Sequence, residues 1–406
     1  MEGLRLRGAL GNVFIKRASL MCGSGVLERT PMLEIKRIDA GGNLKDFYNC
    51  VDTIYARDPN YVRALDMDLG ERLHPKKNPF FDHGEAVFFT AHKGGKCVGR
   101  ISASIDRGHN EKYDERTGFF GFIDTVNDQE VCSALITRAE EWLRHHGMTR
   151  VQGPMSLNIN EEIGCLVEGF DTPPAIMMPH HHPYQGALVE GAGYKKVKDL
   201  YAWKYKVGAM TDRVKNAHKL VGEMPEVSAR PLNMKNLKAD ILACVDIFND
   251  AWSDNWGSVA ITIPEAEKLA KDLGMVLLPE LTQIICINGE PAAFAIGLPN
   301  LNEMIGDLGG KVFPFGIAKL MYRLKVVGPK SGRLMLLGVR KKYRSVRKYA
   351  YLSHYMYYAM NEKGREIGMT WGELSWTLED NGAINMGVKS LGAEVYKRYR
   401  IYDKAL

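Results

Sequence analysis

Hydrophobic and polar positions alternate along the chain in a pattern that predicts a mixed α/β protein. Runs with a period of two predict strands, and apolar residues three or four apart predict helices. In the first part of the chain the predicted elements are strand Leu33–Ile38, helix Leu44–Ala56, a hairpin of Ala86–Ala91 and Val98–Ile105, strand Phe119–Ile123, a helix from a capping box at Asn127 and Glu130 to Gly147, and strand Thr149–Pro154.

The same order of elements returns in the second part of the chain. The predicted elements there are helix Ala239–Ala251, a helix from Thr262 and Pro264 to Gly274, a hairpin of Leu281–Ile287 and Ala292–Ile296, strand Leu334–Val339, a helix to about Lys363, and strand Trp371–Thr377. In each round a further helix, a glycine turn and a final strand follow. We interpret this order as an internal duplication, with repeats at residues 32–208 and 226–406.

A short literal repeat supports the duplication and locates an insertion. Gly147-Met148-Thr149 recurs as Gly368-Met369-Thr370. From this motif to the turn glycine, Gly193 or Gly392, the first repeat is about 22 residues longer. The extra residues fall at 156–179 and include Asn158, Asn160, Glu161 and Glu162. Such an insertion is typical of a substrate-binding loop or lid.

Positive charge is concentrated in one part of the second repeat. Residues 311–348 contain twelve Lys or Arg and no Asp or Glu, although the whole chain carries only +6. A strand, a basic loop and a helix N-terminus together favour phosphate binding. The corresponding turn of the first repeat, 124–130, is acidic and would repel phosphate. The alternative is a solvated basic face or a nucleic-acid patch.

Composition narrows the class of protein. The 406 residues are 45% hydrophobic and 25% charged, as in soluble globular proteins, and no apolar run is long enough for a membrane span. Seven scattered cysteines without a C-x-x-C pair indicate a reducing compartment and no zinc site, so we expect a cytoplasmic protein. Residues 1–31 show no clear helical or strand period. We expect them to be a disordered leader or the result of a start codon assigned too far upstream, and a transit peptide is the alternative.

Several sequences resemble a known acyltransferase family. LGVRKKYRSVRKYA resembles the strand, loop and helix with which GNAT acyltransferases grip the pyrophosphate of coenzyme A. NPFFDHGEAVFF, GPMSLNINEEIGCLVEGFDTPPAIMMPHHHPY, FNDAWSDNWG and VYKRYRIYDK resemble the bacterial tandem-GNAT family that includes ceramide synthase. The resemblance covers roughly residues 32–406. It implies two GNAT-like units with mixed sheets and transfer of a long-chain acyl group from acyl-CoA to a sphingoid amine.

The resemblance also implies that the two repeats have different roles. The second repeat would bind acyl-CoA, and the first would shape the acceptor site. The implied donor-binding residues are Gly338, Val339, Arg344, Ser345, Val346, Arg347 and Lys348. The chain departs from the GNAT pattern where Ser345, Arg347 and Tyr349 replace loop glycines. Val388 and Val189 stand where a tyrosine acid is usual, and His180-His181-His182 lies where an asparagine is expected.

Amide formation from a thioester requires a neutral amine and a polarised carbonyl. A backbone N–H near Gly338-Val339 could polarise the carbonyl. Candidate catalytic residues are Glu379, Asn381, Glu161 and His182. Helix capping is the alternative for Glu379 and Asn381, and solvation is the alternative for the insertion acids. Three consecutive histidines do not converge easily on one ion, so no metal is predicted.

The segment Phe313–Val327 interleaves apolar and basic residues. This pattern predicts a basic amphipathic helix that contacts an anionic membrane at the inner face, or a packing helix with a wet basic side. Two other functions stay open: a transferase that takes its acyl group from charged tRNA, and a non-catalytic acyl-CoA-binding or regulatory protein. Because no aromatic platform is interleaved with the basic run, no nucleic-acid partner is expected.

Overall fold

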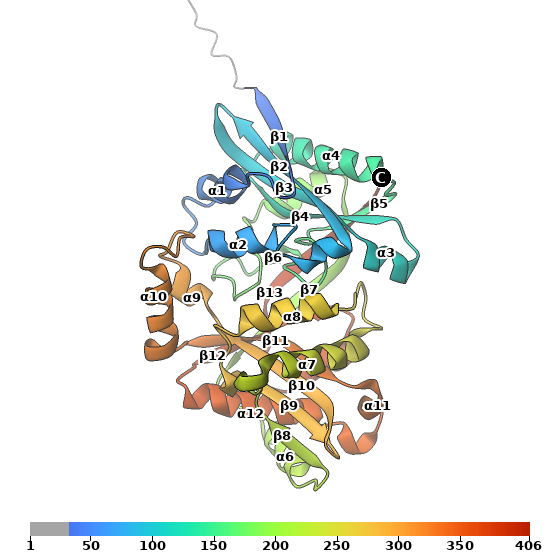
Figure 1. Ribbon diagram of the computed structural model, residues 1–406, viewed down its shortest axis with the longest axis vertical. Coiled ribbons are helices and arrows are strands. Elements are labelled where there is room, and N and C mark those ends of the chain that lie inside the picture. The colour runs from blue at the N-terminus through green and yellow to red at the C-terminus, as the bar shows by residue number, and fades with distance from the viewer. Residues whose placement is uncertain (1–31) are drawn as a thin grey trace, which may run out of the picture. The chain divides into compact units, whose positions relative to one another are not determined.

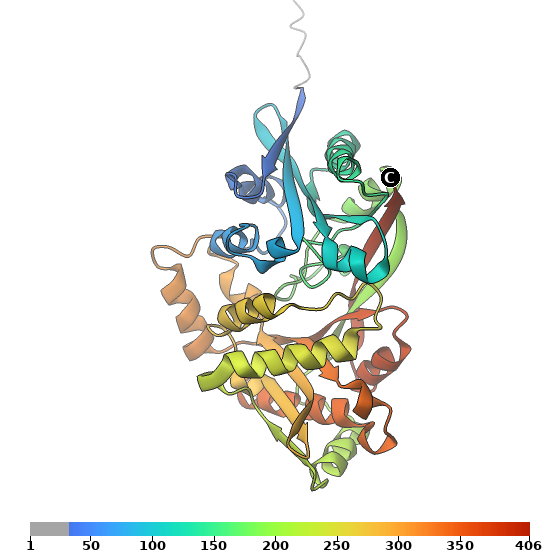
Figure 2. The same ribbon diagram turned by 45° about the vertical axis from the view of Figure 1, so that its right-hand side comes forward.

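A computed structural model describes residues 32–406 (Figures 1 and 2). In the first repeat the elements are β1 (Leu33–Asp39), α1 (Lys45–Ile54), α2 (Asp66–Arg72), η1 (Pro79–Asp82), β2 (Gly84–Lys93), β3 (Lys96–Asp106), α3 (Arg107–Tyr113), β4 (Thr117–Thr125), α4 (Gln129–His145), β5 (Arg150–Gly153), β6 (Cys165–Glu168), α5 (Gln185–Gly191) and β7 (Lys195–Lys206).

The remaining elements belong to the second repeat and to the connection that leads into it. They are α6 (Asp212–Gly222), β8 (Val227–Arg230), η2 (Met234–Asn236), α7 (Leu237–Trp252), α8 (Ile263–Leu273), η3 (Pro279–Leu281), β9 (Thr282–Ile287), β10 (Glu290–Pro299), α9 (Asn302–Ile305), α10 (Gly316–Tyr322), η4 (Arg323–Val327), β11 (Ser331–Val339), α11 (Lys341–Arg344), η5 (Arg347–Tyr349), α12 (Leu352–Glu366), β12 (Trp371–Leu378), α13 (Gly382–Lys389) and β13 (Glu394–Ala405).

The predicted α/β class with mixed sheets is confirmed. One 13-stranded sheet joins both repeats, in the order β1-β2-β3-β4-β5-β13-β7-β12-β11-β10-β9-β8, and β6 pairs with β13 off this path. Both predicted hairpins form, as β2–β3 and β9–β10. The predicted capping box at Asn127 is wrong: α4 begins one residue later, where the Asp128 carboxylate accepts from the backbone N–H of Glu130.

The two repeats exchange their final strands. β13, the last strand of the second repeat, lies between β5 and β7 of the first. In turn, β7 pairs with β12 of the second repeat. All three pairings are antiparallel, and at the centre Tyr399 of β13 lies opposite Leu200 of β7. Both of these side chains are buried, so each repeat completes its sheet and its core with a strand of the other (Figure 1).

Helices cover the sheet on both faces, and each face has its own apolar core. In the first repeat α4 packs on β3 through Val131 and Leu135, and α1 packs on the opposite side through Phe47. In the second repeat α7 and α8 cover one face, while α12 lies on the other against α6 (Figures 1 and 2). The sheet is therefore buried on both faces, as expected for an α/β fold.

His83 ties the two repeats together with its imidazole ring. Its ring nitrogens lie 3.2 Å from the carboxylates of Asp106 in β3 and Glu265 in α8. Hydrogen bonds to Asp106 and then to Glu265 raise the pKa of His83 to about 10. The imidazolium therefore bridges one carboxylate of each repeat.

This bridge predicts a pH-dependent contribution to stability. Because the folded pKa of His83 lies above the unfolded value of ~6.5, the contribution is complete below about pH 6.5 and is lost as pH rises through about 10. His83→Gln should lower the free energy of unfolding at pH 6 by about 1.5–3 kcal/mol. The difference from the parent should shrink steadily toward pH 10.

Urea denaturation at a series of pH values measures this effect. The exposed histidine His145 supplies the control, and His145→Gln should leave stability within about 0.5 kcal/mol of the parent. A deficit of His83→Gln that stays constant from pH 6 to 10 would contradict the ionic bridge.

Candidate active site

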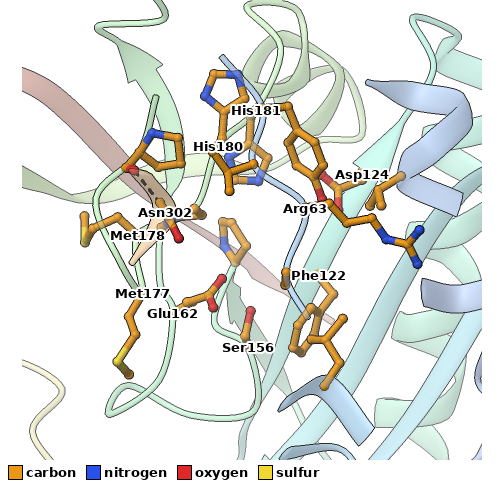
Figure 3. Close-up of a pocket in the computed structure, with 18 of the residues that line it drawn as sticks. Arg63, Phe122, Asp124, Ser156, Glu162, Met177, Met178, His180, His181 and Asn302 are labelled. Carbon is orange, nitrogen blue, oxygen red and sulfur yellow. Dashed lines mark hydrogen bonds between the residues drawn. The ribbon is translucent and has the colours of Figure 1, made fainter. Parts of the chain in front are cut away.

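A cavity of about 110 Å³ lies where β4 and β5 of the first repeat separate. These parallel strands pair only from Thr117 to Phe119, and β4 then continues to Thr125 paired with β3 alone. Phe122 adopts a left-handed conformation with φ of 48° where the pairing of β4 with β3 is interrupted, between Gly121 and Asp124. The insertion after β5 closes the opening, so the cavity lies between β4 and the insertion (Figure 3).

The cavity is lined by both polar and apolar side chains. The polar ones belong to several elements, and the apolar ones belong to helices, a strand and the insertion. In Figure 3, Ser156 and Glu162 lie on one side, and Arg63 and Asp124 on the other. The polar lining residues are Tyr48, Tyr61, Arg63, Arg100, Asp124, Ser156, Glu162, His180, His181 and Asn302, and the main apolar ones are Val51, Leu69, Phe122, Met177 and Met178.

Arg100 and Asp124 form a buried ion pair at one side of the cavity. The guanidinium Nε donates to Asp124 at 2.8 Å, and its Nη1 donates to the carbonyl of Phe47 at 3.1 Å. The hydroxyl of Tyr55 donates to the same carboxylate and lies 3.1 Å from the carbonyl oxygen of His180. Burial raises the pKa of the Tyr55 hydroxyl, which stays protonated. With these partners, Asp124 has a fixed structural role.

Arg72 meets three carboxylates at the opposite side. Its guanidinium lies 2.7 Å from Glu162, 3.1 Å from Glu161 and 3.7 Å from Asp68. Burial raises the pKa of Glu161, and the neighbouring Glu162 and Asp68 raise it further. Three carboxylates around one guanidinium leave excess negative charge, and Glu162 carries it to the cavity surface.

The three consecutive histidines have three different environments. His180 Nε2 lies 2.9 Å from Asp58, and burial lowers the pKa of His180. His181 lines the cavity and accepts the N–H of Leu166 at Nδ1, while burial lowers its pKa to about 4. His182 lies 3.0 Å from the carbonyl of Ile54 and does not line the cavity. Residues 32–406 contain no cluster of His, Cys, Asp or Glu suited to a metal ion.

The second repeat holds the insertion in place. Lys397 of β13 donates to the carbonyls of Gly169 and Thr172, the latter at 2.7 Å. Burial lowers the pKa of Lys397 to about 8. Arg333 of β11 donates to the carbonyls of Ile176 and Met177 at 2.8 and 3.1 Å. The loop that closes the first-repeat cavity is thus positioned by two cations of the other repeat.

The basic loop of the second repeat is largely ion-paired. Carboxylates distant in sequence neutralise four of its cations: Arg340 pairs with Asp246, Lys341 with Asp254, Lys342 with Glu290 and Lys348 with Glu226. This arrangement confines the unpaired positive charge to fewer side chains than the sequence indicates.

Arg344 and Arg347 are the cations that remain in this loop without a carboxylate partner among residues 32–406. The Arg344 guanidinium donates to the carbonyl of Ala251 at 3.2 Å. One backbone donor is occupied, since the N–H of Lys341 bonds to Asp250 at 2.7 Å. Any anion bound at this loop therefore meets these two arginines first.

Two indoles fill the gap between β11 and β12. The strands pair in parallel only as far as Leu334 and Leu374. Beyond that point the Trp252 indole N–H donates to the carbonyl of Leu337 at 3.0 Å, and Trp376 packs on Trp252 at 5.7 Å between ring centroids. Because strand residues alternate, Val339 presents its backbone N–H to the same gap as Leu337, whereas Gly338 faces β10.

The structure separates the four candidate catalytic residues. Glu161 belongs to the Arg72 cluster beside the cavity. Glu379 instead accepts the N–H of Asp199 at 3.0 Å and pairs with Lys196 at 2.7 Å. Asn381 caps α13 through its side-chain oxygen. None of the four lines the cavity, although Glu162, the neighbour of Glu161, does.

The sequence analysis missed the cations that organise the cavity. Arg72 ends α2, and Arg100 lies within a strand, β3, that is buried from Gly99 to Asp106. A charged residue in such a strand is a signal of a buried ion pair.

Comparison with known proteins identifies the family. The chain is 40% identical to bacterial ceramide synthase of Caulobacter vibrioides over 92% of its own length and 98% of that protein. It is 39% identical to the protein YghO of Escherichia coli over 90% of its length and 93% of that protein. No family model matches. The chain belongs to the bacterial ceramide synthase family.

Solved structures confirm the fold of this bacterial ceramide synthase family member. A tandem GNAT protein from the clavulanic acid biosynthesis pathway matches with a TM-score of 0.55 and 12% identity, over 92% of the chain and 98% of that structure. A GCN5-related glucosamine N-acetyltransferase region of a fungal protein matches with a TM-score of 0.54 over 93% of the chain. The family and the tandem GNAT fold together make the chain an acyltransferase.

The contacts of Lys397 predict how firmly the insertion is held. Lys397→Met keeps the apolar stem but removes the donor, so the carbonyls of Gly169 and Thr172 lose their partner. We expect a loss of about 1–3 kcal/mol in the free energy of unfolding and faster amide exchange across 165–179. Hydrogen exchange measured by mass spectrometry checks both. Lys389→Met, at an exposed lysine, is the control, and equal exchange in both variants would contradict this role.

Proposed function

We propose that this acyltransferase moves a long-chain acyl group from acyl-CoA to the amine of a sphingoid base, giving a ceramide-like lipid. The observation that supports it most is the cluster of three carboxylates around Arg72 at the wall of a partly apolar cavity. Such a site prefers a cationic ligand, and a sphingoid base carries an ammonium group on an apolar chain. The name of the Caulobacter relative agrees with this acceptor.

The acceptor amine binds at Glu162 in this proposal. Glu162 faces the cavity while Arg72 holds its carboxylate on the other side. Met177 and Met178 of the insertion form an adaptable apolar wall for the adjoining hydrocarbon. Hydroxyl groups of the acceptor find partners in Ser156 and Asn302.

Glu161 is the general base in this mechanism. The ammonium must lose a proton before its nitrogen attacks the thioester, and Glu161 has a raised pKa that suits it to accept one. The new C–N bond forms as the C–S bond breaks, and coenzyme A leaves as a thiolate. The nitrogen gives up its second proton and the thiolate takes up one, so one proton per turnover is released to solvent through Glu161. Because a thiolate is a good leaving group, the missing tyrosine acid at Val388 is dispensable.

The donor binds at the second repeat. Arg344 and Arg347 hold its phosphates, and the pantetheine arm enters the gap between β11 and β12. There the backbone N–H of Val339 polarises the thioester carbonyl. The Trp252 indole, which caps Leu337 in this gap, rotates away as the donor enters.

Substitution of the base tests the acceptor side. Glu161→Gln should lower turnover about 10²-fold, because a general base typically contributes that much. The defect should shrink as pH rises, since more amine is then already neutral. The measurement is release of coenzyme A thiol together with formation of N-acyl product from acyl-CoA and a sphingoid amine.

Glu379→Gln is the matched control, because Glu379 pairs with Lys196 and does not belong to the carboxylate cluster around Arg72. It should keep the parent rate. If Glu379→Gln instead shows the large defect and Glu161→Gln does not, the base lies at the end of β12. Coenzyme A release that requires no amine, or no release at all, would favour the regulatory or tRNA-dependent alternatives.

Charge reversal in the basic loop tests the donor side. Arg344→Glu with Arg347→Glu should weaken acyl-CoA binding by about 1.5–3 kcal/mol for each lost charge-assisted contact. Titration calorimetry measures the affinity. Arg37→Glu with Arg138→Glu makes the same charge change on exposed first-repeat arginines and should bind as the parent does. Equal losses in both pairs would place the donor elsewhere.

A further inference from the structure

The segment around α10 exposes a concentration of apolar side chains. Of the fifteen exposed large hydrophobic residues within 32–406, six lie between Phe313 and Val327. Phe313 is 72% exposed and Phe315 79%. The other four are Ile317, Tyr322, Val326 and Val327. Exposed apolar side chains gathered on one short segment of a folded surface in this way mark an interaction site.

Ion pairs and a buried side chain hold the segment that carries these residues against the rest of the protein. Asp307, next to α9, pairs with Lys319 at 2.5 Å and with Arg323 at 2.6 Å. Arg323 also donates to the carbonyl of Met304. The Leu324 side chain is buried beneath η4. α10 and η4 therefore present their apolar side chains from a defined position at the edge of the folded repeats (Figures 1 and 2).

The charges around the patch are predominantly positive. From Asn302 to Lys330 there are five basic residues and two acidic ones. Lys319 and Arg323 share the carboxylate of Asp307, while Glu303 accepts from the hydroxyl of Ser331. Among residues 32–406 no carboxylate lies within ion-pair distance of Lys311, Lys325 or Lys330. Free lysines beside exposed aromatic rings match the surface of an anionic bilayer.

The residues just before this patch, from Asn302 to Gly310, lie at the cavity wall. Asn302, at the start of α9, lines the cavity and donates to the carbonyls of Pro174 and Ala175 at 3.0 and 3.1 Å. The carbonyl of Gly310 accepts the N–H of Asp66 at 2.8 Å, beside the cavity residue Arg63. A surface that docks here would bring a lipid bilayer to the edge of the cavity.

We propose that the surface formed by Phe313, Phe315, Ile317, Tyr322, Val326 and Val327, with Lys311, Lys325 and Lys330, docks the protein on an anionic lipid bilayer. The aromatic rings enter the interface, and the lysines contact lipid phosphates. Within residues 32–406 no helix is long and apolar enough to cross a membrane, so the contact is peripheral. The inference stands whether or not the cavity binds the proposed amine.

Sedimentation of the full chain with lipid vesicles tests this surface. One set of vesicles is phosphatidylcholine alone, and in the other one lipid in three is phosphatidylglycerol. The parent should bind the anionic vesicles and release them as salt rises. Phe313→Ser with Phe315→Ser should lower the partition coefficient about tenfold or more, because each ring loses its burial in the interface. Lys311→Ser with Lys325→Ser should lower it for anionic vesicles only.

Met275→Ser with Met386→Ser removes two exposed methionines elsewhere and is the matched control, which should bind as the parent does. Circular dichroism confirms that all variants are folded. Equal binding by the phenylalanine pair and the control, equal binding to both lipid compositions, or no binding by the parent would overturn the proposal. A dimer that the phenylalanine variant dissolves, without vesicle binding, would overturn it in favour of a second copy of the chain.

Discussion

The pairing of β7 with β13 is the constraint on which the rest of the structure depends. Each strand belongs to one repeat by sequence and to the sheet of the other repeat by hydrogen bonding. Without β13, β5 would be paired with β4 alone and its sheet would end in an open edge. Without β7, β12 would likewise be paired with β11 alone. The repeats are therefore one folding unit, in which Leu200 and Tyr399 share a core.

The strand exchange also positions the insertion that closes the cavity. Lys397 reaches the insertion because β13 runs beside β6 and β7, and Arg333 reaches it because β11 lies close to the same centre. The cavity of the first repeat is thus closed by cations of the second. In the proposed mechanism, the first repeat supplies the carboxylates for the amine, and the second supplies the arginines for the phosphate-bearing donor.

Local patterns in the sequence predicted much of the fold and less of the site. Alternation gave both hairpins and the final strands, because side-chain period depends on near neighbours. It could not pair β13 with β5, since such a pairing joins residues some 250 positions apart. Glu161 was predicted from the insertion, but its partner Arg72 was not, and the carboxylates that neutralise Lys342 and Lys348 lie 52 and 122 positions upstream. The number of basic residues in a stretch of sequence therefore overestimates the positive charge that remains unpaired in the folded loop.

Separating the repeats tests the central claim most directly. The chain can be divided in the connection after Gly208, and the fragments 32–208 and 209–406 produced alone or together. If the exchanged strands make one acyltransferase from two repeats, each fragment alone will be unfolded by circular dichroism and will release no coenzyme A from acyl-CoA and a sphingoid amine. Co-expression will restore a folded complex and coenzyme A release. A fragment that folds alone and releases coenzyme A at the rate of the whole chain would contradict the account.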